Sequence, residues 1–166
     1  MRIQSIVRES IVDGPGIRYV VFAQGCPHNC PGCHNPQTHD PAGGSEMTAQ
    51  ELIADFERET EENPLLDGVT ISGGEPLTQS AELARFAEAV RAMGFSVWLY
   101  TGYTIEEIAM SQNREELSLV YAADVLVDGK FEMSKKTLEK RFVGSGNQRI
   151  IERPKLYIHT IRNSDG

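Results

Sequence analysis

The regular alternation of strand-like and helix-like segments is the feature that most constrains the fold of this chain. Runs rich in β-branched and aromatic residues predict four strands and two further candidates, at residues 18–23, 68–72, 95–100, 124–127, 149–152 and 155–160. Strands that alternate with helices are typical of a parallel sheet with crossover helices. A closed eight-stranded barrel usually needs ~250 residues, whereas this chain has 166. We therefore expect an α/β fold of the partial, open parallel β/α barrel type, with about six strands.

Serine and threonine residues mark where the helices are expected to begin. Thr48 and Thr104 each precede a glutamate by three residues, which is the spacing of a capping box. Ser80 is expected to cap a helix with apolar side chains at helical spacing. No repeat or long linker interrupts these segments, so residues 1–166 are expected to form one domain.

Glycines, cysteines and charged residues follow the four clearest strands, at residues 26–33, 73–76, 101–103 and 128–130. The carboxyl ends of parallel strands meet at one edge of the sheet, and ligands bind at that edge in α/β proteins. We therefore expect these residues to form one site. A partial barrel also leaves an open side, through which a piece of another protein could enter.

All the cysteines of the chain lie in one window of eight residues, at Cys26, Cys30 and Cys33. This spacing brings three thiols onto one loop, close enough to bind a single metal centre. An iron–sulfur cube normally takes four cysteine ligands, so a cube bound here would have one iron without a protein thiolate. An open metal position is the mark of a catalytic site rather than a structural one.

A zinc site is the alternative interpretation of these cysteines, with His28, His34 or His39 as the fourth ligand. Structural zinc sites usually combine two ligand clusters from separate segments, and the sequence has no second cluster, which favours the iron–sulfur interpretation. Closely spaced thiols would be oxidised outside the cell, so we expect a reducing cytoplasm.

The segment Ser72-Gly73-Gly74-Glu75-Pro76 carries the second group of candidate residues. Two consecutive glycines at the end of a strand allow a ligand to lie directly against the backbone. The carboxylate of Glu75 suits an ammonium group, and Pro76 favours an extended conformation at Glu75. A plain strand-to-helix turn is the alternative interpretation of this segment.

Charge and hydropathy exclude two classes of partner. The net charge is −8 and no basic run is present, which disfavours nucleic-acid binding because that requires clustered Lys and Arg. The longest apolar stretches, such as residues 19–23, are far too short to cross a bilayer. Residues 1–5 lack the apolar run of a secretory signal.

The cysteine spacing together with Ser-Gly-Gly-Glu-Pro resembles the radical S-adenosylmethionine (SAM) superfamily. Residues 12–18 and Cys33-His34-Asn35 resemble the members that activate glycyl-radical proteins. The short chain, with residues 128–131 and 144–149, is most similar to the group that activates the class III (anaerobic) ribonucleoside-triphosphate reductase. An activase of pyruvate formate-lyase or a related enzyme is the alternative within the same class, although those chains tend to be longer. A non-catalytic, zinc-stabilised binding module is the alternative from another class.

The resemblance implies that a [4Fe–4S] cluster is held by Cys26, Cys30 and Cys33. SAM would bind the open iron, and an electron from the cluster would cleave it to a 5′-deoxyadenosyl radical. That radical would take a hydrogen atom from one glycine of the reductase. Flavodoxin or ferredoxin would be the electron donor. Gly32 and His34 would lie along the adenosyl part. Many members have an aromatic residue at the position of Gly32, so adenine stacking here has to come from elsewhere or be absent.

Further contacts to SAM are implied at the ends of the later strands. The backbone of Gly73 and Gly74, with Glu75, would receive the methionyl ammonium, and Lys130 would contact the carboxylate. Asp128 would buttress the site, or it and Lys130 would be solvated charges at the end of a strand. Four other residues carry separate expectations. Tyr103 is expected to face the site, and His159 is expected to be a core histidine in an apolar strand. Asn147 and Arg149 are expected to contact a ligand or partner, or else to form a polar turn.

Overall fold

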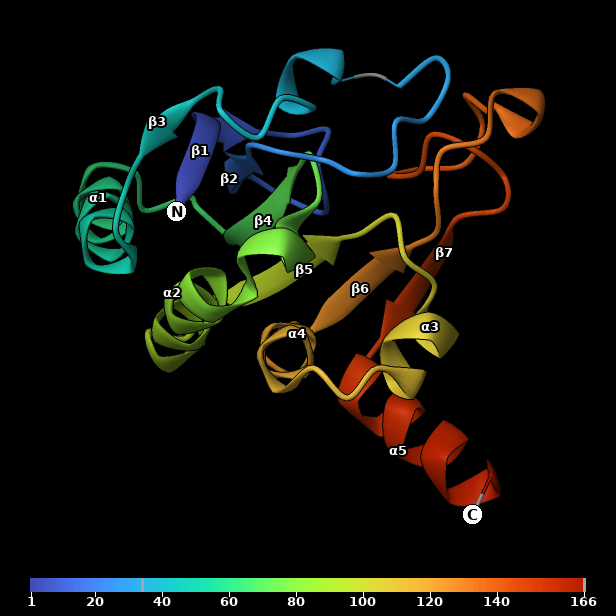
Figure 1. The fold of residues 1–166 in the computed structure, drawn as a ribbon. Helices are drawn as coiled ribbons and strands as arrows, with labels where there is room; N and C mark the ends of the chain where they lie inside the picture. Colours follow the sequence, from blue (N-terminus) through green and yellow to red (C-terminus); the bar gives the residue numbers. More distant parts are fainter. Residues whose placement is uncertain (34, 166) are drawn as a thin grey trace.

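Seven strands form one sheet in the computed structural model, which describes residues 1–33 and 35–165. In chain order they are β1 (Arg2–Ser10), β2 (Arg18–Ala23), β3 (Ser45–Glu46), β4 (Gly68–Gly73), β5 (Ser96–Tyr100), β6 (Val125–Asp128) and β7 (Arg149–Glu152). Across the sheet the order is β3-β1-β2-β4-β5-β6-β7 (Figure 1). The central strands β2, β4, β5 and β6 are parallel, and β1, β3 and β7 pair antiparallel to their neighbours.

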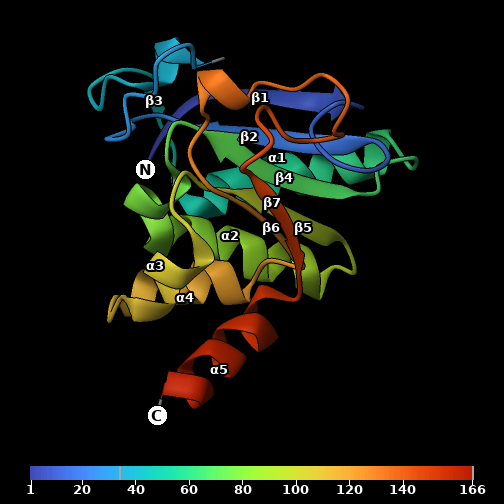
Figure 2. The same cartoon turned by 90° about the vertical axis from the view of Figure 1, so that its right-hand side faces the viewer.

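The helices pack on one side of this sheet, as the two perpendicular views show (Figures 1 and 2). They are α1 (Ala49–Glu62), α2 (Ser80–Ala92), α3 (Ile105–Met110), α4 (Arg114–Tyr121) and α5 (Pro154–Asp165). Short 3₁₀ turns lie at η1 (Pro36–Thr38), η2 (Pro76–Gln79) and η3 (Met133–Lys135). Within the part of the chain that the structure describes, no helix combines the length and the apolar character needed to span a bilayer.

The main core lies between the helices and the sheet. Leu52 and Phe56 of α1 and Phe86 of α2 are fully buried, and the Phe56 ring meets the Tyr19 ring edge-to-face with centroids 5.2 Å apart. Their helical spacing puts these side chains on the face of each helix that meets the strands. Burying them removes large apolar areas from water and is the main driving force for this layer.

A second, smaller cluster lies apart from that core and is closed by residues 129–148. Trp98 on β5 packs edge-to-face against Phe142, with ring centroids 5.3 Å apart. Val125, Val127 and Val143 complete this cluster. The segment after β6 therefore covers strands β5 and β6 where no helix does.

Two of the three expected helix caps are confirmed. The Thr48 hydroxyl accepts a hydrogen bond from the Glu51 N–H at 3.1 Å, and the Thr104 hydroxyl accepts one from the Glu107 N–H at 3.2 Å. The prediction for Ser80 is wrong, because α2 begins at Ser80 itself and Gln79 is the N-cap. The Ser80 hydroxyl instead donates to the Leu77 carbonyl in the preceding 3₁₀ turn.

The sequence-based sheet needs three corrections. The sheet is mixed rather than all parallel, because β1, β3 and β7 run antiparallel, and it has seven strands instead of about six. Segment 155–160 is part of α5: Pro154 favours the first turn of a helix, and Ile158 and Ile161 pack against the core one helical turn apart. His159 is consequently an exposed helical residue rather than a core histidine.

Candidate active site

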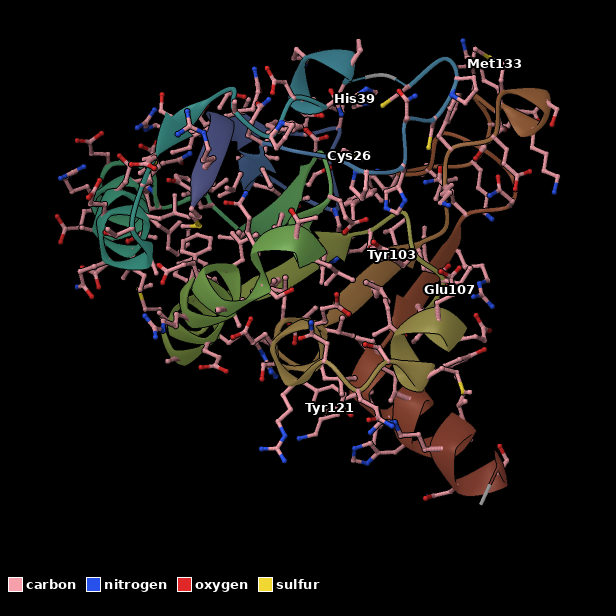
Figure 3. All side chains as sticks on the ribbon, viewed as in Figure 1. Cys26, His39, Tyr103, Glu107, Tyr121 and Met133 are labelled. Atoms are coloured by element: carbon pink, nitrogen blue, oxygen red, sulfur yellow. The ribbon has the colours of Figure 1, made fainter. Side chains whose placement is uncertain are left out.

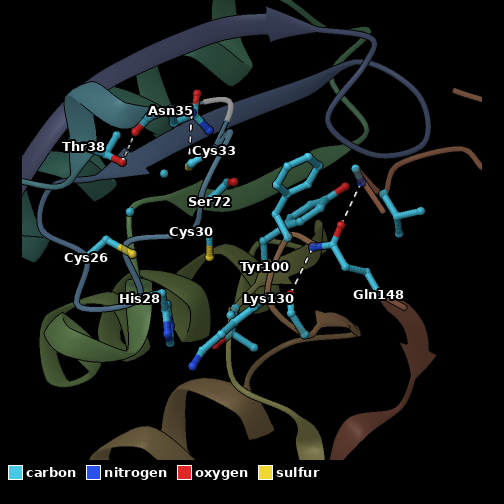
Figure 4. A pocket seen from close by; sticks show the side chains of 18 of the residues that line it. Cys26, His28, Cys30, Cys33, Asn35, Thr38, Ser72, Tyr100, Lys130 and Gln148 are labelled. Atoms are coloured by element: carbon cyan, nitrogen blue, oxygen red, sulfur yellow. Dashed lines mark hydrogen bonds between the residues drawn. The ribbon is translucent and has the colours of Figure 1, made fainter. Parts of the chain in front are cut away.

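A cavity of about 410 Å³ opens at the carboxyl edge of the parallel strands (Figure 4). The loops after β2, β4, β5 and β6 all contribute to it, through residues that include Cys26, Cys30, Cys33, Ser72, Gly73, Gly74, Thr101, Gly102, Lys130 and Phe131. The structure therefore brings the four groups of unusual residues together, as the parallel topology predicted. Figure 3 shows Cys26, His39 and Tyr103 at this edge, with Met133 on the segment that crosses it.

Backbone hydrogen bonds join the two ends of the cysteine loop to each other. The Gly25 N–H donates to the Thr38 carbonyl at 2.6 Å, and the Cys26 N–H donates to the His39 carbonyl at 3.3 Å. The Asn35 N–H donates to the Cys33 sulfur at 3.4 Å. All three cysteines are free and partly exposed, so their thiols are available to a metal centre in the cavity.

Burial raises the pKa of the Cys26 and Cys30 thiols above the usual value. Thiols with raised pKa values stay protonated near neutral pH, and a metal centre must displace those protons on binding. In residues 1–33 and 35–165, no three His, Cys, Asp or Glu side chains are arranged around a single metal ion. His34, one of the ligands proposed for the zinc alternative, lies outside the described residues.

The two glycines after β4 lie where the cysteine loop crosses the sheet edge. The Gly74 N–H donates to the Ala23 carbonyl at 2.9 Å, and the Glu75 N–H donates to the Gly25 carbonyl at 2.8 Å. Gly73 has φ +106°, and a Cβ on either glycine would collide with this neighbouring backbone. The glycines are thus needed for the chain's own packing, besides exposing backbone to the cavity.

Substituting Gly74 by Val should lower both cluster content and SAM affinity, since the side chain would push against the Gly25 and Thr38 carbonyls that anchor the cysteine loop. We expect iron content per chain after anaerobic reconstitution to fall severalfold. Gly146→Val is the matched control, because Gly146 is exposed, has no positive φ, and a Cβ there meets only the Lys135 carbonyl at an ordinary contact distance of 3.7 Å. Full iron content in Gly74→Val would show that the loop tolerates the displacement.

Glu75 is fully buried behind these glycines. Its carboxylate accepts hydrogen bonds from the Gly102 N–H at 2.7 Å, the Leu77 N–H at 3.0 Å and the Thr101 hydroxyl at 2.9 and 3.0 Å. His28 Nε2 lies 2.6 Å from the same carboxylate. Glu75 therefore connects three loops, and its contact with a ligand stays a prediction.

At the end of β6, Asp128 forms a structural pair with Arg149 of β7, whereas Lys130 is a cation at the cavity. Asp128 is fully buried; it accepts from the Ile105 N–H at 2.8 Å, which is at the start of α3, and from Arg149. The interpretation of Asp128 as a solvated charge is therefore wrong. Arg149 also pairs with Glu106, so it joins β7 to α3. Lys130 is exposed and lines the cavity.

The sequence assigned no role at the cavity to Phe142 or Met133, and it marked Phe131 only as part of the segment 128–131. Phe131 and Phe142 line it from the segment after β6, and the Tyr100 hydroxyl donates to the Phe142 carbonyl at 2.7 Å. Gly32 has φ +73°, and a Cβ there would collide with Met133 of the same segment. No strand or helix pattern marks residues 131–148, which is why their approach to the cysteine loop was invisible in the sequence.

Comparison with known proteins identifies the family. Residues 12–151 match the family described as "4Fe-4S single cluster domain". The chain belongs to this iron–sulfur family. It is 33% identical over 145 residues to the anaerobic ribonucleoside-triphosphate reductase-activating protein of Escherichia coli (strain K12), covering 83% of this chain and 90% of that protein. The protein of the same name from Enterobacteria phage T4 is 34% identical over 146 residues, covering 84% and 86%.

A second kind of relative matches over a shorter region. The pyruvate formate-lyase-activating enzyme of Clostridium pasteurianum is 45% identical over 107 residues, which cover 61% of this chain but only 44% of that enzyme. The resemblance to activating proteins of the 4Fe-4S family is thus confirmed, and its greatest extent is with the reductase-activating proteins. The zinc-stabilised binding module is not supported.

Proposed function

We propose that this chain activates an anaerobic ribonucleoside-triphosphate reductase by generating a glycyl radical on it. The observation that carries the proposal is a set of three free thiols, without a fourth cysteine in the sequence, around one cavity that also exposes the backbone of two glycines. When bound and reduced, the [4Fe–4S] cluster would supply one electron that cleaves SAM into methionine and a 5′-deoxyadenosyl radical, and this radical would take a hydrogen atom from a glycine of the reductase to give 5′-deoxyadenosine and the glycyl radical.

Three thiols suit such a cluster because thiolates are the ligands that iron–sulfur centres prefer. Cys26, Cys30 and Cys33 would hold it, and the iron left without a protein ligand would accept SAM. The cavity of about 410 Å³ offers space for a small molecule beside the cysteine loop.

The remaining predicted contacts complete the proposal for SAM. The backbone of Gly73 and Gly74 would receive the methionyl ammonium, with the buried charge of Glu75 behind it, and Lys130 would pair with the carboxylate. Gly32 would lie along the adenosyl part, as would His34. Opposite charges at the two ends of the site would orient a zwitterionic amino-acid group in one direction.

The partial barrel also belongs to this proposal. Strand β7 pairs antiparallel with β6 and is the last strand of the sheet. The parallel part of the sheet therefore ends at β6, and the sheet stays open at β7. We propose that the open side admits the glycine-bearing segment of the reductase to the cavity. A flavodoxin or ferredoxin would supply the electron, and free cysteines suit a cytoplasmic setting.

The test is a reconstitution of the whole reaction. The chain is loaded anaerobically with iron and sulfide, reduced with dithionite, and mixed with SAM and the reductase. We expect a brown protein that dithionite bleaches, and a glycyl-radical signal by electron paramagnetic resonance (EPR) on the reductase only when SAM is present. A signal with pyruvate formate-lyase and none with the reductase would favour the other activase function, and a colourless zinc protein would contradict both.

A further inference from the structure

One side chain of the cysteine loop is buried although its neighbours are exposed. The His28 side chain is 6% exposed, whereas Pro27, Asn29, Pro31 and Gly32 are all exposed. His28 lies between the first two cysteines and lines the same cavity (Figure 4). Burying a polar ring costs free energy unless the ring has a hydrogen-bond partner. The partner of His28 therefore indicates which part of the site this side chain is bound to.

That partner is the carboxylate of Glu75. His28 Nε2 lies 2.6 Å from Glu75 Oε1, and the Glu75 side chain is 0% exposed. Both oxygens of this carboxylate already accept from backbone N–H groups, so we assign Nε2 as the donor of the pair. The same oxygen, Oε1, accepts from the Gly102 N–H at 2.7 Å. One buried atom therefore joins the loop after β2 to the loop after β5.

The fold makes room for the ring at this position. A Cβ on Gly102 would lie 2.6 Å from His28 Nε2, so only glycine lets the ring lie against the backbone. On another side the ring meets Tyr103 edge-to-face, with centroids 4.6 Å apart. His28 is thus held by a hydrogen bond to a buried carboxylate and by packing from two successive residues of one loop.

We propose that His28 is a positioning residue that couples the cysteine loop to the Gly-Gly-Glu turn, so that the cluster ligands and the SAM-binding backbone keep a fixed relative placement. The inference rests on the proposed function, because it assumes a cluster on the cysteines and SAM on the glycines. His28 acts through Glu75, which also holds the Thr101 hydroxyl and the Leu77 N–H. Movement of one loop would therefore be transmitted to the others.

Such a coupling should affect SAM binding more than cluster assembly. The cysteine loop keeps its backbone anchors to Thr38 and His39 without the His28 side chain, so the cluster can still form. Loss of a partner that orients metal ligands typically costs about 10- to 100-fold in affinity or activity. We expect a loss of this size in the apparent affinity for SAM.

The test compares three reconstituted variants with the wild-type protein. His28→Leu fills the space but cannot donate, and His28→Gln restores a donor near the position of Nε2. His159→Ala is the control, since His159 is exposed on α5. We expect His28→Leu to raise the apparent Kd for SAM at least about tenfold, measured from the SAM-induced change in the EPR spectrum of the reduced cluster. His28→Gln should recover most of the affinity, and His159→Ala should match wild type.

A double-mutant cycle gives an independent measurement. Gly102→Ala should displace the His28 ring and weaken SAM binding in the same way. If it acts through His28, the double variant His28→Ala/Gly102→Ala should be no weaker than His28→Ala alone, because the small side chain at position 28 leaves room for the added Cβ. Additive losses, or a His28→Leu variant with wild-type affinity, would overturn the inference. Should His28→Leu fail to fold, Gly102→Ala decides alone, and wild-type affinity in that variant overturns the inference.

Failure of the proposed function is distinguishable from failure of this inference. If the wild-type cluster itself shows no spectral change with SAM, the proposed function is wrong. If wild type responds and the His28 and Gly102 variants respond equally, only the coupling role is wrong.

Discussion

Replacing Cys30 by Ala should give a folded chain that holds little iron and forms no glycyl radical. Cys30 is partly exposed in a loop at the sheet edge and lies outside both buried clusters, so its loss should change the free energy of unfolding by less than about 1 kcal/mol. The cluster, by contrast, loses one of its three available thiolates. We expect radical yield on the reductase to fall below detection by EPR.

Pro31→Ala is the matched control for this experiment. Pro31 is exposed and lies between Cys30 and Cys33, so it tests whether any change in the loop has the same effect. Iron content should stay near the wild-type value in Pro31→Ala and drop severely in Cys30→Ala. A full, SAM-responsive cluster in Cys30→Ala would mean that the ligand set is wrong.

Replacing Arg18 by Ala should destabilise the chain by about 3 kcal/mol or more. Arg18 is 1% exposed at the start of β2, at the opposite end of the parallel strands from the cavity. Its guanidinium donates to the Thr70 hydroxyl at 2.8 Å, to the Val69 carbonyl at 2.8 Å and to the Ser96 carbonyl at 3.1 Å. One side chain thus ties β2 to β4 and β5.

The expected loss has two physical components. Removing the guanidinium leaves buried acceptors without that donor, which costs about 1–3 kcal/mol per group, and removing the side chain leaves a cavity. Burial also lowers the pKa of Arg18 to about 10 because the cation loses its water; this desolvation cost offsets part of what the hydrogen bonds contribute.

Denaturant unfolding of the chain without its cluster measures the effect of Arg18→Ala. Arg85→Ala is the control, because the Arg85 side chain is 71% exposed and pairs with Glu82 on the same helix; it should cost less than about 0.5 kcal/mol. Equal stability of Arg18→Ala and wild type would show that the buried cation is not a net stabilising element.

The sequence predicted structure correctly where that structure depends only on residues close together in the chain. The N-caps at Thr48 and Thr104 and the strand at 68–72 follow from short-range backbone and side-chain chemistry, and they are confirmed. The strand predicted at 155–160 failed for the complementary reason. Its residues are compatible with a strand and with a helix. The helix forms because it packs Ile158 against the core.

The strand β1 escaped detection because nothing in its sequence identifies its partners. It pairs with β2 on one side and β3 on the other, and both pairings depend on residues far along the chain. The antiparallel direction of β7 is likewise set by the connection through residues 129–148. Topology of this kind is a property of long-range pairing rather than of composition.

By itself, the sequence identified the candidate donor groups, since three cysteines on one loop and two glycines after a strand can be read directly from residue types and spacing. Only the tertiary structure decided how those groups are joined, through the buried carboxylate of Glu75, the ring of His28 and the segment of Phe131 and Phe142. The reason is that ligand chemistry is local to each side chain. Hydrogen bonds and packing between loops, in contrast, exist only once distant strands have been placed side by side.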